Sequence, residues 1–339
     1  MIYFRADANQ NIGMGHIMRC LSLADAASQY DQDIIFVLAD ECVKKVVEDR
    51  GFKTIILHSN YQLLDDELDK WPHEKPDYLI VDSYYVTESY FASLKAMLGD
   101  GKLIYIDDLA KFPYQVDYLI NYNAFGPHLN YHKLYSDSKI SEPVFILGTT
   151  YVPLRKEFQN TDIKEQPEIV KNVLISTGGS DLKHVALSIV KTNPKDYCYH
   201  ILIGALNKDK NEIYSIVENN EHIIIHESVI NMKSLIESMD IVISAAGSTT
   251  YEVSACGVPL ITYSVADNQI PGAVAFKEDG IAEYIGDIRN DKNFVEKIML
   301  KIKELSGNHA KRIAIGNKMQ KMVDGYGADR IIKIIIDKA

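Results

Sequence analysis

The residues best placed to do chemistry lie in a loop near the start of the chain, at residues 11–19, with the sequence NIGMGHIMR. Gly13 and Gly15 let the backbone approach a ligand closely, and the helix expected after them presents unpaired N–H groups and a positive dipole end. We therefore expect this loop to bind a phosphate, or a negative charge that develops during a reaction.

His16 lies in the first turn of that expected helix, where the dipole disfavours the protonated imidazole. A neutral imidazole is a competent general base. Arg19 lies three residues further along the same face, which favours a role in a site over the alternative that His16 caps or packs the loop. We predict His16 to be catalytic, and Gly13, Gly15 and Arg19 to bind substrate.

The same loop argues against a dinucleotide site. The NAD fingerprint G-x-G-x-x-G needs a glycine at position 18, where this chain has Met18, and Asp40 is a poor candidate for the ribose-binding acid of strand two. The four cysteines are scattered without C-x-x-C spacing, and the chain has no H-E-x-x-H motif and no histidine cluster. We therefore expect neither a cofactor nor a metal.

The elements that must position these residues follow an α/β pattern. Short β-branched runs such as YLIVD and LIYID alternate with longer amphipathic segments, which predicts parallel sheets covered by helices on both faces. Residues 121–151 are irregular and contain prolines, and a second α/β cycle starts with NVLIST near residue 171. We predict two Rossmann-like, doubly wound domains, residues 1–161 and 162–339, facing each other across a cleft. The apolar closing segment 327–338 is predicted to be a helix that could return to the first domain.

Charge and hydropathy limit the classes of partner that the protein is expected to bind. The 339 residues carry a net charge of −11, from 36 Lys and Arg against 47 Asp and Glu, which disfavours nucleic acid. The chain has no apolar run of about 18 residues and no signal-peptide pattern at its start. We expect a cytoplasmic protein without stable membrane association; oligomeric state stays open.

Further candidates follow strands, at the edge where open α/β sheets bind ligands. Two glycine-bearing turns suit a diphosphate and a nucleoside, although each alone is more often a simple tight turn. Tyr84 follows YLIVD, where a substrate contact and a surface aromatic are both open. Asp82 could cap the following turn, and Asp107 and Asp108 are interpreted as helix or loop caps. The turn residues predicted to bind substrate are Gly178 and Gly179 after NVLIST, and Gly247 and Ser248 after IVISA.

Taken together, these segments resemble a known family. The stretch FRADANQNIGMGHIMRCLSLA, with VDSYY, GTTYVPLRKEF, STGGSD, ISAAGSTTYEVSACGVPLI, ADNQ and DGYGADRI, is similar to the UDP-sugar hydrolases of the pseudaminic-acid pathway and to their spore-coat polysaccharide relatives. That family resembles the GT-B glycosyltransferases. The resemblance implies a GT-B-like fold and hydrolysis of UDP-2,4-diacetamido-2,4,6-trideoxy-β-L-altropyranose to UDP and the free sugar, with His16 matching the catalytic base.

The resemblance also assigns four binding residues. It implies that Tyr84 contacts substrate, that Glu252 accepts the ribose hydroxyls, and that Asn268 and Gln269 match an asparagine–glutamine pair of the family. Residue chemistry alone leaves alternatives open, because Glu252 would also suit a helix N-terminus and Asn268 a turn.

The chemistry is reasonable for the residues present. UDP leaves as an already ionised phosphate, so one base and anion-binding N–H groups suffice, and water activated by His16 would displace UDP from C1, with inversion expected. Three alternatives stay open: a GT-B glycosyltransferase that uses an alcohol in place of water, a non-catalytic UDP-sugar-binding protein, and a UDP-sugar 2-epimerase.

Overall fold

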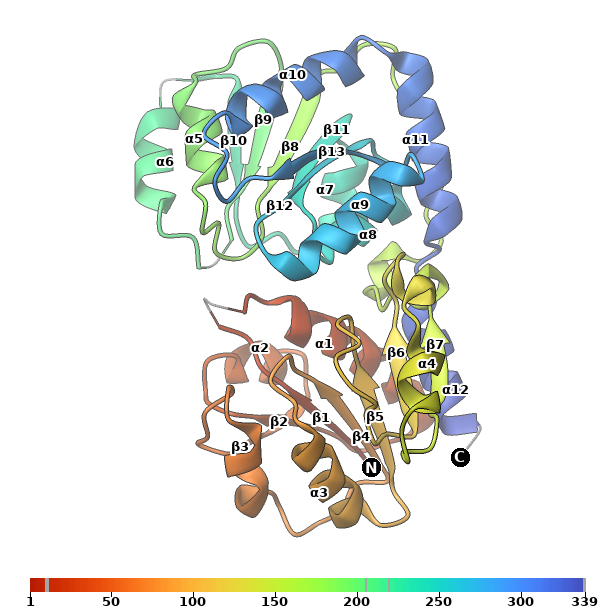
Figure 1. Ribbon diagram of the computed structural model, residues 1–339. Helices are drawn as coiled ribbons and strands as arrows, with labels where there is room; N and C mark the ends of the chain where they lie inside the picture. Colours follow the sequence, from red (N-terminus) through yellow and green to blue (C-terminus); the bar gives the residue numbers. More distant parts are fainter. Residues whose placement is uncertain (10–11, 205, 219, 338–339) are drawn as a thin grey trace. The chain divides into compact units, whose positions relative to one another are not determined.

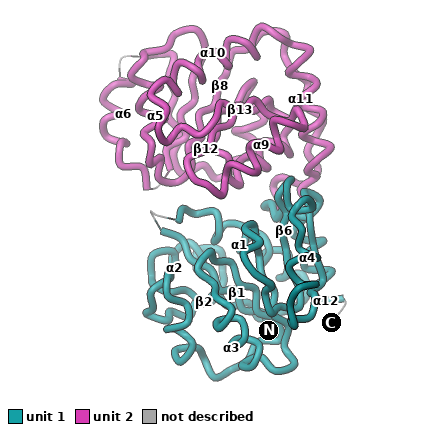
Figure 2. Tube along the Cα trace, in the orientation of Figure 1, with its two compact units in different colours: residues 1–155, 326–339 teal, residues 156–325 magenta. Residues whose placement is uncertain are grey.

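The computed structural model describes residues 1–9, 12–204, 206–218 and 220–337, and it contains two compact units. Unit 1 comprises Met1–Arg155 and Tyr326–Ala339, and unit 2 comprises Lys156–Gly325 (Figures 1 and 2). The sequence analysis placed the division at residues 161/162, within a polar stretch that contains no regular strand or α-helix. The units divide six residues earlier, and the closing helix lies in unit 1.

Unit 1 is built on a parallel seven-stranded sheet in the order β3-β2-β1-β4-β5-β6-β7. The strands are β1 (Ile2–Ala6), β2 (Ile34–Leu38), β3 (Lys53–Ile56), β4 (Tyr78–Asp82), β5 (Lys102–Ile106), β6 (Tyr118–Asn121) and β7 (Val144–Leu147). The strand order reverses between β1 and β4, where β2 and β3 extend in one direction and β5 to β7 in the other. The carboxyl ends of β1 and β4 therefore form the crevice where such sheets bind ligands.

The helices of unit 1 connect these strands and cover the sheet. They are α1 (Gly15–Ala27), α2 (Lys44–Glu48), α3 (Glu88–Leu98), α4 (Tyr131–Ser136) and α12 (Gly327–Asp337), with short 3₁₀ turns η1 (Ser28–Tyr30), η2 (Leu64–Lys70), η3 (Gly126–His128) and η4 (Thr149–Tyr151). The closing helix α12 packs against α1, and its side chains Ile331, Ile332 and Ile335 are buried. Residue 338, which the sequence analysis included in this helix, lies outside the described residues.

Unit 2 repeats the plan with a parallel six-stranded sheet in the order β10-β9-β8-β11-β12-β13. Its strands are β8 (Asn172–Ser176), β9 (Cys198–Leu202), β10 (Ile223–His226), β11 (Ile241–Ala245), β12 (Leu260–Ser264) and β13 (Ala282–Asp287). Its helices are α5 (Val185–Lys191), α6 (Lys210–Val217), α7 (Met232–Glu237), α8 (Thr249–Cys256), α9 (Ile270–Glu278), α10 (Phe294–Ser306) and α11 (His309–Met322), with η5 (Lys156–Phe158) and η6 (Asp267–Gln269). The reversal here lies between β8 and β11.

The predicted α/β class with two parallel sheets is confirmed. Residues 121–151, where the sequence pattern is irregular, nevertheless contain the short helix α4 and the strand β7. The run VFIL follows Pro143 and forms the edge strand of the sheet, paired on one side with β6. A four-residue run behind a proline carries too little pattern to distinguish such a strand from a loop.

Candidate functional site

The candidate site of unit 1 lies at the switch point of its sheet, where α1 begins after β1 and where β4 ends. His16 is the second residue of α1, and Asp82 is the last residue of β4 (Figure 1 shows these elements). Ala6 and Asp82 are register partners in the neighbouring strands β1 and β4. The contact between these strands brings His16 close to Asp82, although the two residues are 66 positions apart in the sequence.

The loop before α1 is shaped by one glycine. Gly13 adopts a φ of 75°, and its N–H donates to the carbonyl of Asn9 at 2.8 Å, so the chain turns sharply before the helix. Gly15 is the first residue of α1, and the residue before it, Met14, provides no side-chain cap. Asn11, at the start of the predicted motif, lies outside the described residues.

His16, Arg19 and Asp82 form a buried hydrogen-bonded cluster. Nδ1 of His16 lies 2.6 Å from Oδ1 of Asp82, and Nε and Nη2 of Arg19 donate to the two oxygens of the same carboxylate. An unprotonated Nδ1 would set its lone pair against a carboxylate oxygen at this distance, so we assign Nδ1 as the N–H donor. In that tautomer, Nε2 carries the lone pair.

The charge of Asp82 is maintained by its neighbours. Burial alone would raise the pKa of this carboxyl, but the Arg19 guanidinium, and His16 to a lesser extent, outweigh burial and hold the pKa below its usual range. The thiol of Cys20 lies 3.6 Å from Oδ2 as a further donor. Asp82, which the sequence analysis interpreted as a cap, is instead the residue that orients His16. The sequence feature that could have indicated this role is an acid at the end of a buried strand, at the edge where such sheets bind ligands.

Arg19 is largely engaged within the protein. Besides its bonds to Asp82, Nη1 donates to the hydroxyl of Tyr122 at 2.8 Å, and Nη2 lies 2.9 Å from Nδ1 of His16. The guanidinium therefore spans β4 and the residue after β6. This arrangement indicates that Arg19 holds the Asp82 carboxylate; its predicted contact with substrate stays a prediction.

The ring of Tyr84 contacts the ring of His16 directly. The two rings make a T-shaped contact with centroids 4.6 Å apart, and the Tyr84 hydroxyl donates to Oδ2 of Asp108 at 2.8 Å. His16, Asp82 and Tyr84 line one small pocket, whose other lining residues are Asp7, Ile12, Tyr61, Ser83 and Tyr85. The lining of this pocket thus combines carboxylates and aromatic rings around the imidazole of His16.

In unit 2, the predicted residues lie after three neighbouring strands, β8, β11 and β12, so they share one edge of the sheet. The two glycine turns differ in whether a side chain caps the N–H groups at the start of the helix that follows. Gly178 has a φ of 84°, but the carboxylate of Asp181 accepts hydrogen bonds from the N–H groups of Val185 and Ala186, both at 2.9 Å. Because Asp181 caps α5, this helix end does not offer a site for a second anion.

The turn before α8 is open. A Cβ added to Gly247 would meet no described atom within 4 Å, and Ser248 makes no side-chain cap to the helix. The N–H groups of Thr250 and Tyr251 bond to the carbonyls of Gly247 and Ser248, whereas those of Ser248 and Thr249 have no hydrogen-bond partner among the described residues. Of the two glycine turns, the α8 turn is therefore better suited to an anion.

The remaining predicted residues of unit 2 flank this turn. Gly179 follows Gly178, and its carbonyl accepts from the N–H of Leu206 at 3.0 Å. Glu252 lies in the first turn of α8. Asn268 and Gln269 lie in η6 after β12, where Oε1 of Gln269 accepts from the N–H of Val265 at 2.8 Å and so braces the loop.

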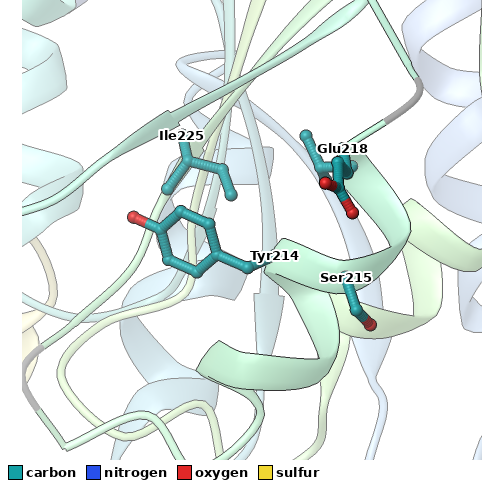
Figure 3. A pocket seen from close by; sticks show the side chains of 5 residues that line it. Tyr214, Ser215, Glu218 and Ile225 are labelled. Carbon is teal, nitrogen blue, oxygen red and sulfur yellow. The ribbon is translucent and has the colours of Figure 1, made fainter.

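A larger hollow lies elsewhere on unit 2, along α6 and β10. Tyr214, Ser215, Val217, Glu218 and Ile225 line it, and Figure 3 shows the Tyr214 ring beside Ile225. Its lining residues include neither a histidine nor the N-terminal turn of a helix. The smaller pocket at His16 is therefore the better candidate for chemistry, despite its size.

Similar proteins agree with this architecture. Residues 172–325 match the model of the glycosyltransferase family 28 C-terminal domain. MurG of Acinetobacter baumannii superposes with a TM-score of 0.65 at 13% identity, covering 100% of this chain and 99% of that one. The chain has the GT-B fold.

Two relatives are more similar in sequence. An uncharacterized protein of Methanocaldococcus jannaschii is 25% identical over 267 residues, covering 75% of this chain and 54% of the relative, so the match spans about half of that protein. The UDP-2,4-diacetamido-2,4,6-trideoxy-beta-L-altropyranose hydrolase of Campylobacter jejuni is 29% identical over 255 residues, covering 72% of this chain and 85% of the relative. Within the described part of the chain, no helix is long and apolar enough to cross a membrane.

Proposed function

We propose that this protein is a nucleotide-sugar hydrolase that releases UDP and a free sugar by attack of water at C1. The observation that carries the proposal is the His16–Asp82 pair, in which Nδ1–H donates to a buried carboxylate and leaves Nε2 as a base in a pocket. The 29% identity to a UDP-sugar hydrolase supports it. By that relation, the proposed substrate is UDP-2,4-diacetamido-2,4,6-trideoxy-β-L-altropyranose.

The reaction needs one base and one anion site. Nε2 of His16 takes a proton from water while the water oxygen forms a bond to C1. The bond between C1 and the phosphate oxygen breaks, and its electron pair leaves with UDP. Asp82 stabilises the imidazolium that forms, as a carboxylate does in other histidine-based catalysts. Direct displacement inverts the configuration at C1.

Unit 2 would hold the nucleotide. The N–H groups of Ser248 and Thr249 at the start of α8 would donate to the diphosphate, with Gly247 leaving room for it. Glu252 would accept the ribose hydroxyls, and Asn268 would bind a polar group of the substrate. The match of this unit to a glycosyltransferase domain supports a nucleotide-binding role.

The same match favours a second candidate, transfer of the sugar to an alcohol. Incubating the purified protein with a panel of UDP-sugars alone, with the altropyranose derivative included, separates the two. A hydrolase releases UDP and free sugar in equal amounts, and in H₂¹⁸O the label enters the sugar. An enzyme that is inert until an alcohol is added is a transferase, and binding without turnover indicates a non-catalytic protein.

A further inference from the structure

Two adjacent acids, Asp107 and Asp108, follow β5, and their carboxylates differ in the hydrogen bonds that they accept. The carboxylate of Asp107 accepts four hydrogen bonds, which come from the N–H groups of Leu109 and Ala110 and from the hydroxyls of Tyr114 and Tyr131. Asp107 is 2% exposed. These bonds fold the loop after β5 back onto the sheet, so Asp107 is a structural anchor.

Asp108 has a different environment. Its Oδ2 accepts from the Tyr84 hydroxyl at 2.8 Å, while its Oδ1 is buried without a hydrogen-bond partner among the described residues. Burial raises the pKa of this carboxyl, an effect that nearby Arg19 reduces in part. A buried carboxylate with one unsatisfied oxygen destabilises the fold. Packing therefore gives no reason for an acid at this position, whereas its bond to Tyr84 does.

This bond determines what Tyr84 can do in the pocket. A phenol has one proton, and the proton of Tyr84 points to Asp108. The phenol oxygen can therefore only accept hydrogen bonds from a ligand. A phosphate oxygen offers no proton to such an atom, whereas a sugar hydroxyl, an amide N–H or the attacking water does.

We propose that Asp108 is a positioning residue that fixes the Tyr84 hydroxyl, so that Tyr84 accepts a hydrogen bond from an O–H or N–H group of the sugar beside His16. The inference rests on the proposed function and deepens it. It names the sugar part of the substrate, and not its diphosphate, as the ligand of Tyr84.

Three variants test the role: Asp108→Ala, Asp108→Asn and Tyr84→Phe. Alanine removes the acceptor and lets the hydroxyl rotate, so kcat/KM for the UDP-sugar falls by about 10- to 100-fold, the usual range for a lost hydrogen bond to a charged group. Asparagine keeps a carbonyl acceptor for Tyr84 without the charge. It restores most of the activity and leaves the pH profile of kcat/KM unchanged. Adding Asp108→Ala to Tyr84→Phe causes no further loss.

Three results would overturn the inference. If Asp108→Asn is as impaired as Asp108→Ala and loses one limb of the pH profile, Asp108 acts through its own ionisation. If Asp108→Ala lowers kcat/KM equally with and without the Tyr84 hydroxyl, Asp108 does not act through Tyr84. Full activity of Asp108→Ala likewise contradicts the inference, while it leaves the hydrolase proposal intact.

A measurement without turnover separates this inference from the proposed function. If the wild-type protein releases no UDP from any UDP-sugar, the proposed function fails. In the same proteins labelled with [¹³Cζ]tyrosine, the Tyr84 signal is assigned by its loss in Tyr84→Phe. The inference expects this signal to shift in Asp108→Ala and to stay near its wild-type position in Asp108→Asn. An unshifted signal in Asp108→Ala would show that the hydrogen bond does not orient Tyr84.

Discussion

Nδ1 of His16 lies 2.6 Å from Oδ1 of Asp82, and the Arg19 guanidinium donates to both oxygens of the same carboxylate. One acid thus orients the base and is itself kept ionised by a cation three residues along α1. Both side chains that flank Asp82 come from the first turns of one helix, so a single strand–helix contact positions the whole group. The geometry favours one tautomer of His16, with Nε2 unprotonated.

Replacing His16 by Asn should lower kcat by about 10²- to 10⁴-fold, the usual contribution of a general base. UDP affinity should change little, because unit 2 is proposed to hold the diphosphate. Steady-state UDP release and calorimetric UDP binding measure the two effects. His132→Ala is a matched control, since His132 also pairs with an acid, Glu142 at 2.6 Å, but is exposed. Near-wild-type kcat in His16→Asn would exclude His16 as the base.

Replacing Asp82 by Asn should destabilise the fold by about 3 kcal/mol at pH 7, because Arg19 then lies buried without its counterion. The folded pKa of Asp82 lies below its unfolded value, so its stabilisation is fully present above about pH 4 and is lost as the pH falls further. Urea unfolding at pH 7 and pH 3 should therefore show a smaller difference between wild type and variant at pH 3.

Asp49→Asn is the control for this measurement. Asp49 pairs with Lys45 on the surface, where both side chains are exposed, and such pairs contribute little. A difference for Asp82→Asn that does not change between pH 7 and pH 3 would mean that the carboxylate charge is not what stabilises the cluster.

Much of the fold can be predicted from local pattern, but the site only in part. The runs YLIVD and IVISA are apolar enough to identify buried strands, and residues 78–82 and 241–245 form β4 and β11. A glycine loop before a helix also identifies His16 locally. The role of Asp82 depends on β4 lying beside β1, and an apolar run does not specify its neighbours in a sheet. An isolated strand-ending aspartate is therefore interpreted as a cap.

Asp108→Asn should change stability in the opposite direction to Asp82→Asn. Burial raises the folded pKa of Asp108, so its carboxylate destabilises the fold at neutral pH. This destabilisation decreases as the pH falls, because the group takes up a proton. The variant should therefore melt at a higher temperature than wild type at pH 7, with a smaller advantage in acid. A lower melting temperature at pH 7 would show that the Asp108 charge stabilises the loop.

Replacing Gly247 by Val should weaken UDP and UDP-sugar binding together while the fold stays intact. A Cβ at this position meets no described atom within 4 Å, so the fold has room for the added side chain, which would reduce the space left for a ligand at this turn. Because the diphosphate is bound equally before and during the reaction, KM should rise with kcat little changed. Gly307→Ala is the control, since a Cβ at Gly307 makes an ordinary contact of 3.5 Å at the end of α10. If Gly247→Val keeps wild-type UDP affinity, the diphosphate does not bind at α8, and the capped turn at Gly178 would have to be reconsidered.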